Sequence, residues 1–289
     1  MKRSTILTIL AVAALAAAGL HTGCDKSGKK VLLRFKLKSG MELDYRLTAR
    51  GPMQEYTDDS LTTDVYVEAQ EDFTCTARRV LEDGTIEKLF TGKWQSRRRP
   101  RTDSVFADTS LRESPAPEFV RYIKPNGKTI DLELLSDTSQ AEETWLKQYH
   151  EQTYPVFPDE EVAPGYSWTQ STRVLLPEGP TNVATTYTIT GFERVSGYDC
   201  AVIGYDGHSL IPLAPQKWEK SELLSGIEDI RFKGHLNFAY REGIEVSAKE
   251  RWLYEGNRRV FRKASGDTVS EKEIVEYDID WGLVGVKNP

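Results

Sequence analysis

The chain has few of the residues that carry most enzyme chemistry. Its 289 residues include four His and three Cys. No H-E-x-x-H, Cys-x-x-Cys, G-x-S-x-G, Walker or GxGxxG pattern occurs, so the common metalloprotease, thiol-redox, hydrolase and nucleotide-binding motifs are missing. We therefore expect no catalytic residue, no set of metal ligands and no cofactor. A hydrolase that uses scattered carboxylates is the remaining enzymatic alternative.

Positive charge is also in short supply. The sequence holds 38 Lys and Arg against 44 Asp and Glu, a net charge of −6. Because clustered positive charge drives nucleic-acid binding, we do not expect a nucleic-acid partner.

No apolar run is long enough to remain in a membrane as a spanning helix. The longest, Ile6 to Leu20, spans 15 residues, whereas a spanning helix needs about 20. It follows Lys2 and Arg3 and ends shortly before a polar stretch, which is typical of a secretory signal peptide. We predict a signal peptide over residues 1–23.

The end of this leader, Leu20-His21-Thr22-Gly23-Cys24, resembles the lipobox of bacterial lipoproteins. The resemblance implies lipidation of Cys24, a tether over residues 24–30, and a chain held by its lipid on the extracytoplasmic side of a cell-envelope membrane. His21 departs from the pattern, which usually has Leu three residues before the cysteine. The alternative is cleavage after Ala16-Ala17-Ala18, which leaves a soluble protein with a free thiol at Cys24.

Residues 31–289 alternate between apolar and charged side chains, as antiparallel strands with one solvated face do. The period is clearest where Met41, Leu43 and Tyr45 alternate with Glu42 and Asp44. A sheet that is apolar on one face has to bury that face. We therefore predict a mainly β fold of long antiparallel strands, curled into an open barrel or a sandwich.

Two local elements are predicted at the middle of the chain. Pro125-Asn126-Gly127-Lys128 predicts a tight hairpin between strands 119–123 and 129–134. Apolar residues at helical spacing and a capping box predict one amphipathic helix over residues 137–152. A similar pattern of turn glycine followed by a strand aromatic suggests two duplicated halves, 31–135 and 160–289, joined by this helix.

Four arginines lie together at Arg97, Arg98, Arg99 and Arg101. Between Gln95 and Pro117 the apolar pattern fails, which predicts an exposed loop. The arginines could contact anionic lipid headgroups or a polyanionic partner. The alternative is a solvated loop or a charged edge that blocks strand addition.

Cys75 and Cys200 form an even pair in a compartment that permits disulfides. A disulfide requires Cα atoms within about 7 Å, which the sequence does not reveal. Two separately buried thiols are the alternative.

The layout of an exported chain with long antiparallel strands and little helix is similar to LolA/LppX-like half-barrel proteins and to uncharacterised β-rich envelope lipoproteins. This resemblance implies an apolar ligand or lipid held by the curved sheet, and it includes no motif that transfers binding residues. Trp168, Tyr187, Phe238 and Trp252 are our candidates for lining such a site, and as core residues they would need no ligand. The alternative function is an envelope scaffold that binds another protein through strand edges or the 95–117 loop.

Overall fold

The computed structural model describes residues 28–101, 110–135, 154–176, 179–217 and 219–289. Within these ranges the chain forms thirteen strands and no helix. The strands are β1 (Glu42–Thr57), β2 (Ser60–Val80), β3 (Ile86–Pro100), β4 (Arg112–Pro115), β5 (Phe119–Ile123), β6 (Thr129–Leu134), β7 (Ser167–Leu176), β8 (Gly179–Val195), β9 (Tyr198–Leu213), β10 (Gln216–Lys217), β11 (Ser221–Ala239), β12 (Ile244–Arg262) and β13 (Asp267–Lys287).

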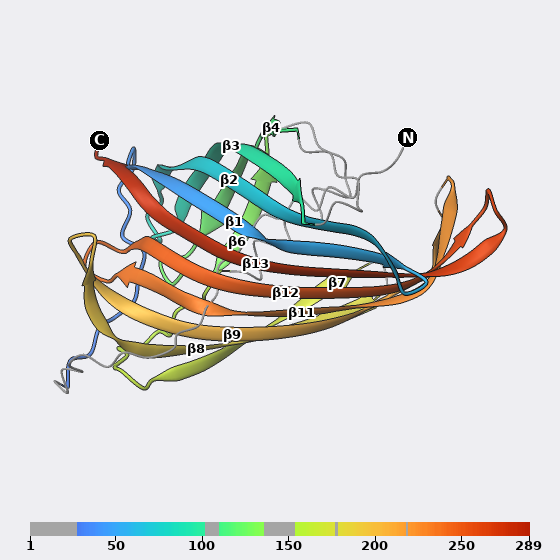
Figure 1. Cartoon of the computed structure of the whole chain (residues 1–289). Coiled ribbons are helices and arrows are strands. Elements are labelled where there is room, and N and C mark those ends of the chain that lie inside the picture. Colours follow the sequence, from blue (N-terminus) through green and yellow to red (C-terminus); the bar gives the residue numbers. More distant parts are fainter. Residues whose placement is uncertain (1–27, 102–109, 136–153, 177–178, 218) are drawn as a thin grey trace.

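All thirteen strands belong to one antiparallel sheet (Figure 1). Its order is β6-β5-β3-β2-β1-β13-β12-β11-β9-β8-β7, with β4 paired to β3 and β10 to β11. Each half of the chain is thus a meander, and the first and last strands, β1 and β13, join the two meanders. The sheet is not closed, because β6 and β7 do not pair with each other in the described part of the chain.

One face of the sheet is buried and the other is charged, as the strand period of two requires. On β1, Leu43, Tyr45 and Leu47 are buried, whereas the alternate residues Arg46 and Arg50 are exposed. Arg46 pairs with Asp72 at 2.6 Å and Arg50 with Asp280 at 3.7 Å. The sheet curls around its apolar face, which we call the inner face (Figure 1). The charged face is the outer face.

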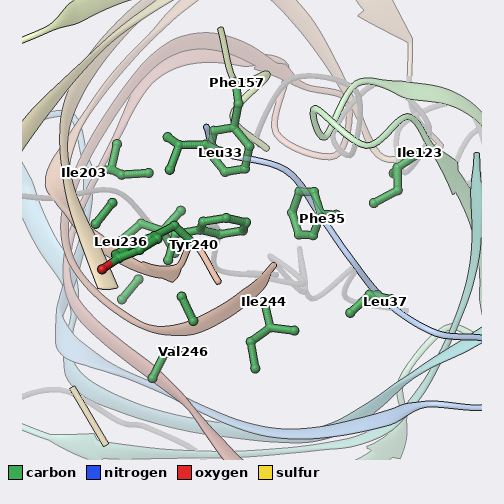
Figure 2. Close-up of a cluster of buried hydrophobic side chains, with 14 of the residues drawn as sticks. Leu33, Phe35, Leu37, Ile123, Phe157, Ile203, Leu236, Tyr240, Ile244 and Val246 are labelled. Carbon is green, nitrogen blue, oxygen red and sulfur yellow. The ribbon is translucent and has the colours of Figure 1, made fainter. Parts of the chain in front are cut away.

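A segment ahead of the first strand fills one end of the concavity. Leu33, Phe35 and Leu37 are buried, and Figure 2 shows them surrounded by side chains of the curled sheet. The Phe35 ring lies 5.7 Å from Phe157 and 5.3 Å from Phe238. Each such side chain contributes about 1.5 to 3 kcal/mol by leaving water. We call residues 31–37 together with Phe157 the plug.

The predicted hairpin around Asn126-Gly127 is confirmed. It joins β5 to β6 within the strand bounds expected from the sequence. Gly127 has a φ of 88°, a conformation that favours glycine. The turn is closed by the Gly127 N–H, which donates to the Lys124 carbonyl at 2.8 Å.

The coarse prediction of a mainly β, curled antiparallel sheet is also confirmed, but the sandwich alternative is wrong. The two meanders meet edge to edge through β1 and β13, so they extend one sheet instead of stacking as two. The predicted helix over 137–152 lies outside the described residues. Duplication of the halves 31–135 and 160–289 stays a prediction.

The proposed disulfide between Cys75 and Cys200 is not formed, and both are buried free thiols. Cys75 lies on β2 and Cys200 on β9, and four strands separate these two in the sheet. The alternative of two separately buried thiols therefore holds.

Candidate functional site

Strand pairing arranges the inner-face side chains in rows that cross the sheet. One complete row passes through Glu71, and we call it the Glu71 row. Directly paired residues have Cβ atoms about 4.5 to 5.5 Å apart, so each member contacts the next. From β8 to β3 the Glu71 row consists of Ile189, Ile203, Leu236, Ala248, Trp281, Leu47, Glu71 and Trp94.

The next row lies two residues further along each strand, away from the plug. It begins with a stack of three aromatic rings, in which Tyr187 lies 5.1 Å from both Trp168 and Tyr205. Beyond the stack the row has small residues at Gly234, Ala49, Ala69 and Ser96, with Glu250 and Ile279 between them. From β7 to β3 this row consists of Trp168, Tyr187, Tyr205, Gly234, Glu250, Ile279, Ala49, Ala69 and Ser96.

All four tryptophans of the described residues lie on the inner face. Trp94 and Trp281 belong to the Glu71 row, and Trp168 belongs to the next row. Trp252 pairs with Tyr277 in a third row, two residues further along each strand from the plug. Each of the four is only partly buried. The inner face beyond the plug therefore keeps aromatic surface that the chain itself does not fully cover, and large aromatic side chains gain most from further burial.

The four predicted lining residues all lie on the inner face, but in two different settings. Phe238 is fully buried and its ring lies 4.7 Å from that of Phe157, so it belongs to the core around the plug. Tyr187 is buried in the aromatic stack. Trp168 and Trp252 keep part of their surface exposed and remain the candidates for contact with a ligand.

Glu71 is a buried acid in an otherwise apolar row. Only 6% of its surface is exposed. Its cross-strand neighbours are Leu47 and Trp94, and among the described residues it makes no hydrogen bond or ion pair. Burial raises the pKa of this carboxyl to about 7. Glu71 was not among the residues predicted from the sequence, although an acid that interrupts the alternating series Val65, Val67, Ala69, Phe73, Cys75 was a readable signal.

Because Glu71 is buried, it should make the folded protein less stable as pH rises. Its folded pKa of about 7 exceeds the ordinary value of 4.5. The folded protein therefore keeps a proton that the unfolded chain releases in this interval, so the free energy of unfolding falls as pH rises from 4.5 to about 7. The loss is on the order of 3 kcal/mol.

We expect Glu71→Gln to abolish this fall and to raise the free energy of unfolding at alkaline pH by about 1 kcal/mol, because a buried amide carries no charge. Urea unfolding followed by circular dichroism at several pH values is the measurement. Asp72→Asn is the control on the outer face of the same strand, where Arg46 lowers the carboxyl pKa, and it should leave the fall in place. An unchanged pH profile in Glu71→Gln would contradict the assignment.

Further from the plug, the inner face carries an ion-paired network. Arg258 donates to Glu228 at 2.8 Å and lies 3.5 Å from Glu273. Tyr254 donates its hydroxyl hydrogen to Glu228 at 2.9 Å. Burial raises the pKa of Glu273, and Arg258 opposes that rise. This network separates the tryptophan-bearing rows from a small apolar cluster of Leu223, Val260 and Val269.

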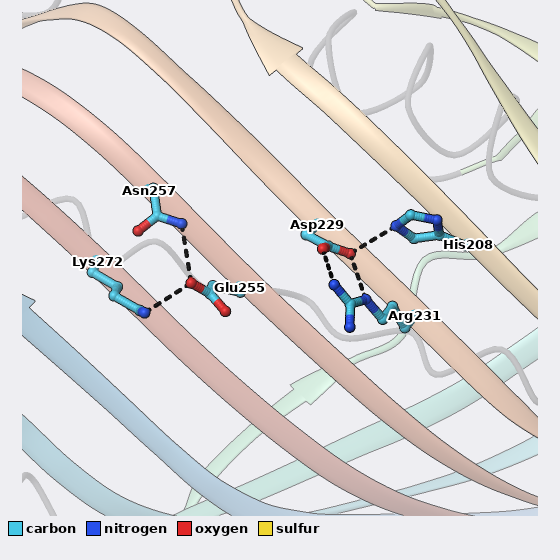
Figure 3. A network of polar contacts seen from close by, with 6 residues as sticks. All are labelled: His208, Asp229, Arg231, Glu255, Asn257 and Lys272. Atoms are coloured by element: carbon cyan, nitrogen blue, oxygen red, sulfur yellow. Dashed lines mark hydrogen bonds and ion pairs between the residues drawn. The ribbon is translucent and has the colours of Figure 1, made fainter.

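Charged groups on the outer face pair with one another. Asp229 lies between His208, at 2.9 Å, and Arg231 (Figure 3). In a separate pair, Glu255 lies 2.8 Å from Lys272. Arg231 lowers the pKa of Asp229 most strongly, burial opposes this, and His208 lowers the pKa further. These outer-face charges thus satisfy one another, whereas Glu71 has no charged partner among the described residues.

No family model matches the chain, and no curated protein matches it. Among solved structures, the chain is similar to one described as lipid–protein interactions in lipovitellin, with a TM-score of 0.43 and 10% sequence identity. The similarity covers 87% of this chain and 26% of the lipovitellin chain. This chain thus spans about a quarter of that protein's length.

The predicted loop over Gln95 to Pro117 is wrong at Gln95–Pro100, which belongs to β3, and at Arg112–Pro115, which forms β4; residues 102–109 lie outside the described residues. Arg97 and Arg99 point to the outer face, where Arg99 pairs with Glu68 at 2.7 Å, and Arg98 lies on the inner face. Arg101 pairs with Asp64 at 3.0 Å. Strand alternation therefore divides the four arginines between two faces, and they do not form one basic patch.

A second set of buried charges lies beside the plug. Arg121 is 1% exposed, its guanidinium carbon lies 3.7 Å from the Tyr154 ring centre, and it donates to Thr129 at 2.9 Å. The Lys88 ammonium lies 5.1 Å from the Phe35 ring centre. Burial raises the pKa of Glu245, while Lys88 and Arg121 oppose the rise. These charges balance one another within the core around the plug.

In the described ranges, no helix is long and apolar enough to cross a bilayer. The same ranges contain no group of three His, Cys, Asp or Glu residues placed to hold a metal ion.

Proposed function

We propose that the inner face of the curled sheet binds an apolar ligand, such as an acyl chain. The proposal depends on one observation: the four described tryptophans gather on this face and remain partly exposed there. Each square ångström of apolar surface that a ligand covers contributes about 25 cal/mol. A concave sheet rich in aromatic side chains with a few polar groups is a common form of small-molecule site.

The proposal includes export and a lipid anchor. Residues 1–23 would be removed and Cys24 acylated, so that the β-rich body is held at the extracytoplasmic surface of the envelope. Two or more acyl chains hold a protein on a membrane more stably than one, at about 0.8 kcal/mol per buried methylene. Intact mass of the membrane fraction tests this: acylated chains should begin at Cys24, and unmodified chains beginning at Gly19 would contradict it.

Ligand binding is tested with the body of the protein and a neutral probe, dodecanol. We expect a saturable change in tryptophan emission. Trp252→Ala should weaken the affinity about tenfold, because Trp252 lies on the inner face. Leu253→Ala is the matched control, since Leu253 is the next residue of β12 and points to the outer face. No saturable binding, or equal affinities of the two variants, would contradict the proposal.

A protein-binding scaffold is the second candidate function. Among the described strands, β6 has a partner on one side only, and Ile130 on this strand is 49% exposed. Such an edge can accept a strand from another protein. A photo-crosslinking residue at position 130 should then form an adduct with one envelope protein, and a crosslinker at the exposed position 284 should not.

A further inference from the structure

The placement of Glu71 bears on which apolar ligand the inner face takes, and any inference from it rests on the proposed function. Glu71 is flanked by Leu47 on β1 and Trp94 on β3. On its own strand, the nearest inner-face residues are Ala69 and Phe73. No described residue offers its carboxyl a hydrogen bond or a positive charge.

Two other buried acids of the sheet, Glu87 and Asp64, are held in ion pairs. Glu87 is 2% exposed and lies 3.3 Å from Arg78 and 2.6 Å from Arg79. Asp64 is 5% exposed and pairs with Arg101 at 3.0 Å. A buried carboxyl without a partner costs stability, because it loses water and gains no hydrogen bond. Glu71 therefore has an unmet capacity to accept a hydrogen bond on the face where the tryptophans lie.

We propose that Glu71 receives the polar head of the bound ligand, and that this ligand is an amphiphile with a protonated amine. The ammonium group supplies both the hydrogen-bond donor and the positive charge that the surroundings of Glu71 lack. The alkyl chain lies along the partly exposed aromatic side chains. A fatty-acid carboxylate is disfavoured, because two carboxylates cannot share this position unless one binds a proton.

Protons take part in this recognition. In the empty site the raised pKa of Glu71 keeps much of the carboxyl protonated near neutral pH. A bound ammonium favours the carboxylate, so binding releases a proton. Tyr154 is the described ionisable group that interacts with Glu71, and Arg121, Glu245 and Cys75 interact in turn with Tyr154. Burial raises the pKa of Tyr154 far above neutral pH, so it does not titrate in this range.

The test compares dodecylamine, dodecanol and dodecanoate in calorimetric titrations of the same protein at mildly acidic and mildly alkaline pH. We expect dodecylamine to bind at least about tenfold more tightly than dodecanoate. Buffers of different ionisation enthalpy should report proton release when dodecylamine binds, and none when dodecanol binds.

Substitution of Glu71 gives the decisive comparison. Glu71→Gln should remove the preference for dodecylamine and the proton release, and should keep dodecanol affinity within about threefold. Glu71→Leu, which also removes the polar group, should likewise remove the preference for dodecylamine and the proton release. It is the control for any effect of the Gln amide itself. Asp72→Asn, on the outer face, should keep the preference.

The outcomes separate this inference from the proposed function. If all three probes bind with equal affinity and Trp252→Ala weakens them, the apolar site stands and the role of Glu71 is wrong. If Glu71→Gln keeps the amine preference, the role of Glu71 is also wrong. If none of the three probes binds, both proposals fall.

Discussion

Gly51→Ala is expected to destabilise the protein by more than about 3 kcal/mol, the upper range for overpacking. Gly51 lies on β1 between Arg50 and Met53, which pair with Asp278 and Val275 of β13 where the two meanders join. A Cβ atom added there would meet the carbonyl oxygen of Glu276 at 1.8 Å and the Tyr277 Cα at 3.1 Å. Both contacts are with backbone, so relief requires the two strands to move apart.

Chemical denaturation followed by circular dichroism measures this loss. Gly282→Ala is the control, because Gly282 lies on β13 in the same strand pair and its added Cβ would meet nothing nearer than 3.9 Å. We expect that variant to stay within about 0.5 kcal/mol of the wild type. Similar losses in the two variants would show that alanine propensity, and not the close approach of the strands, sets the effect.

Arg258→Met is expected to cost about 3 to 4 kcal/mol, because it leaves two acids on the inner face without their positive partner. The side chains of Arg258 and Glu228 are each 21% exposed, and that of Glu273 is 11% exposed. Burial already raises the pKa of Glu273, and Arg258 counteracts it. Without Arg258 that pKa rises further, so the loss of stability should grow as pH increases above the ordinary range of carboxyls.

Unfolding free energies at mildly acidic and mildly alkaline pH measure this effect. Arg251→Met is the matched control on β12, since Arg251 and Glu276 are 66% and 42% exposed and such surface pairs contribute about 0 to 1 kcal/mol. Adding Glu273→Gln to Arg258→Met should recover part of the loss. A loss that is independent of pH would mean that packing of the Arg258 stem is the cause.

The elements that could be predicted from the sequence are those set by residues close together in the chain. Asn126-Gly127 fixes a turn between adjacent strands, and the alternation from Met41 to Ala49 fixes one strand and its faces. The pairing of β1 with β13 joins residues more than 200 positions apart, and each strand alone would accept another apolar neighbour. Local periodicity therefore indicated a curled sheet and left the sandwich alternative open.

The arginines of β3 were misread for a physical reason. Toward the end of β3 that lies far from the plug, the inner face becomes polar, so Ser96 and Arg98 take the places of apolar residues and the alternation disappears from the sequence. Of the candidate site, Trp168 and Trp252 were predictable as inner-face aromatics. Glu71 became significant only when pairing placed Leu47 and Trp94 on either side of it.

The pairing of the first strand with the last has a consequence for how the protein reaches its final form. While the chain is being synthesised, β1 has an unpaired edge until β13, more than 200 residues later, has been made. Contacts between distant segments form slowly, and exposed edges invite association with other chains. Completion of the sheet therefore waits for β13, and a chain that stalls before it has an unpaired β1 edge at the centre of the sheet.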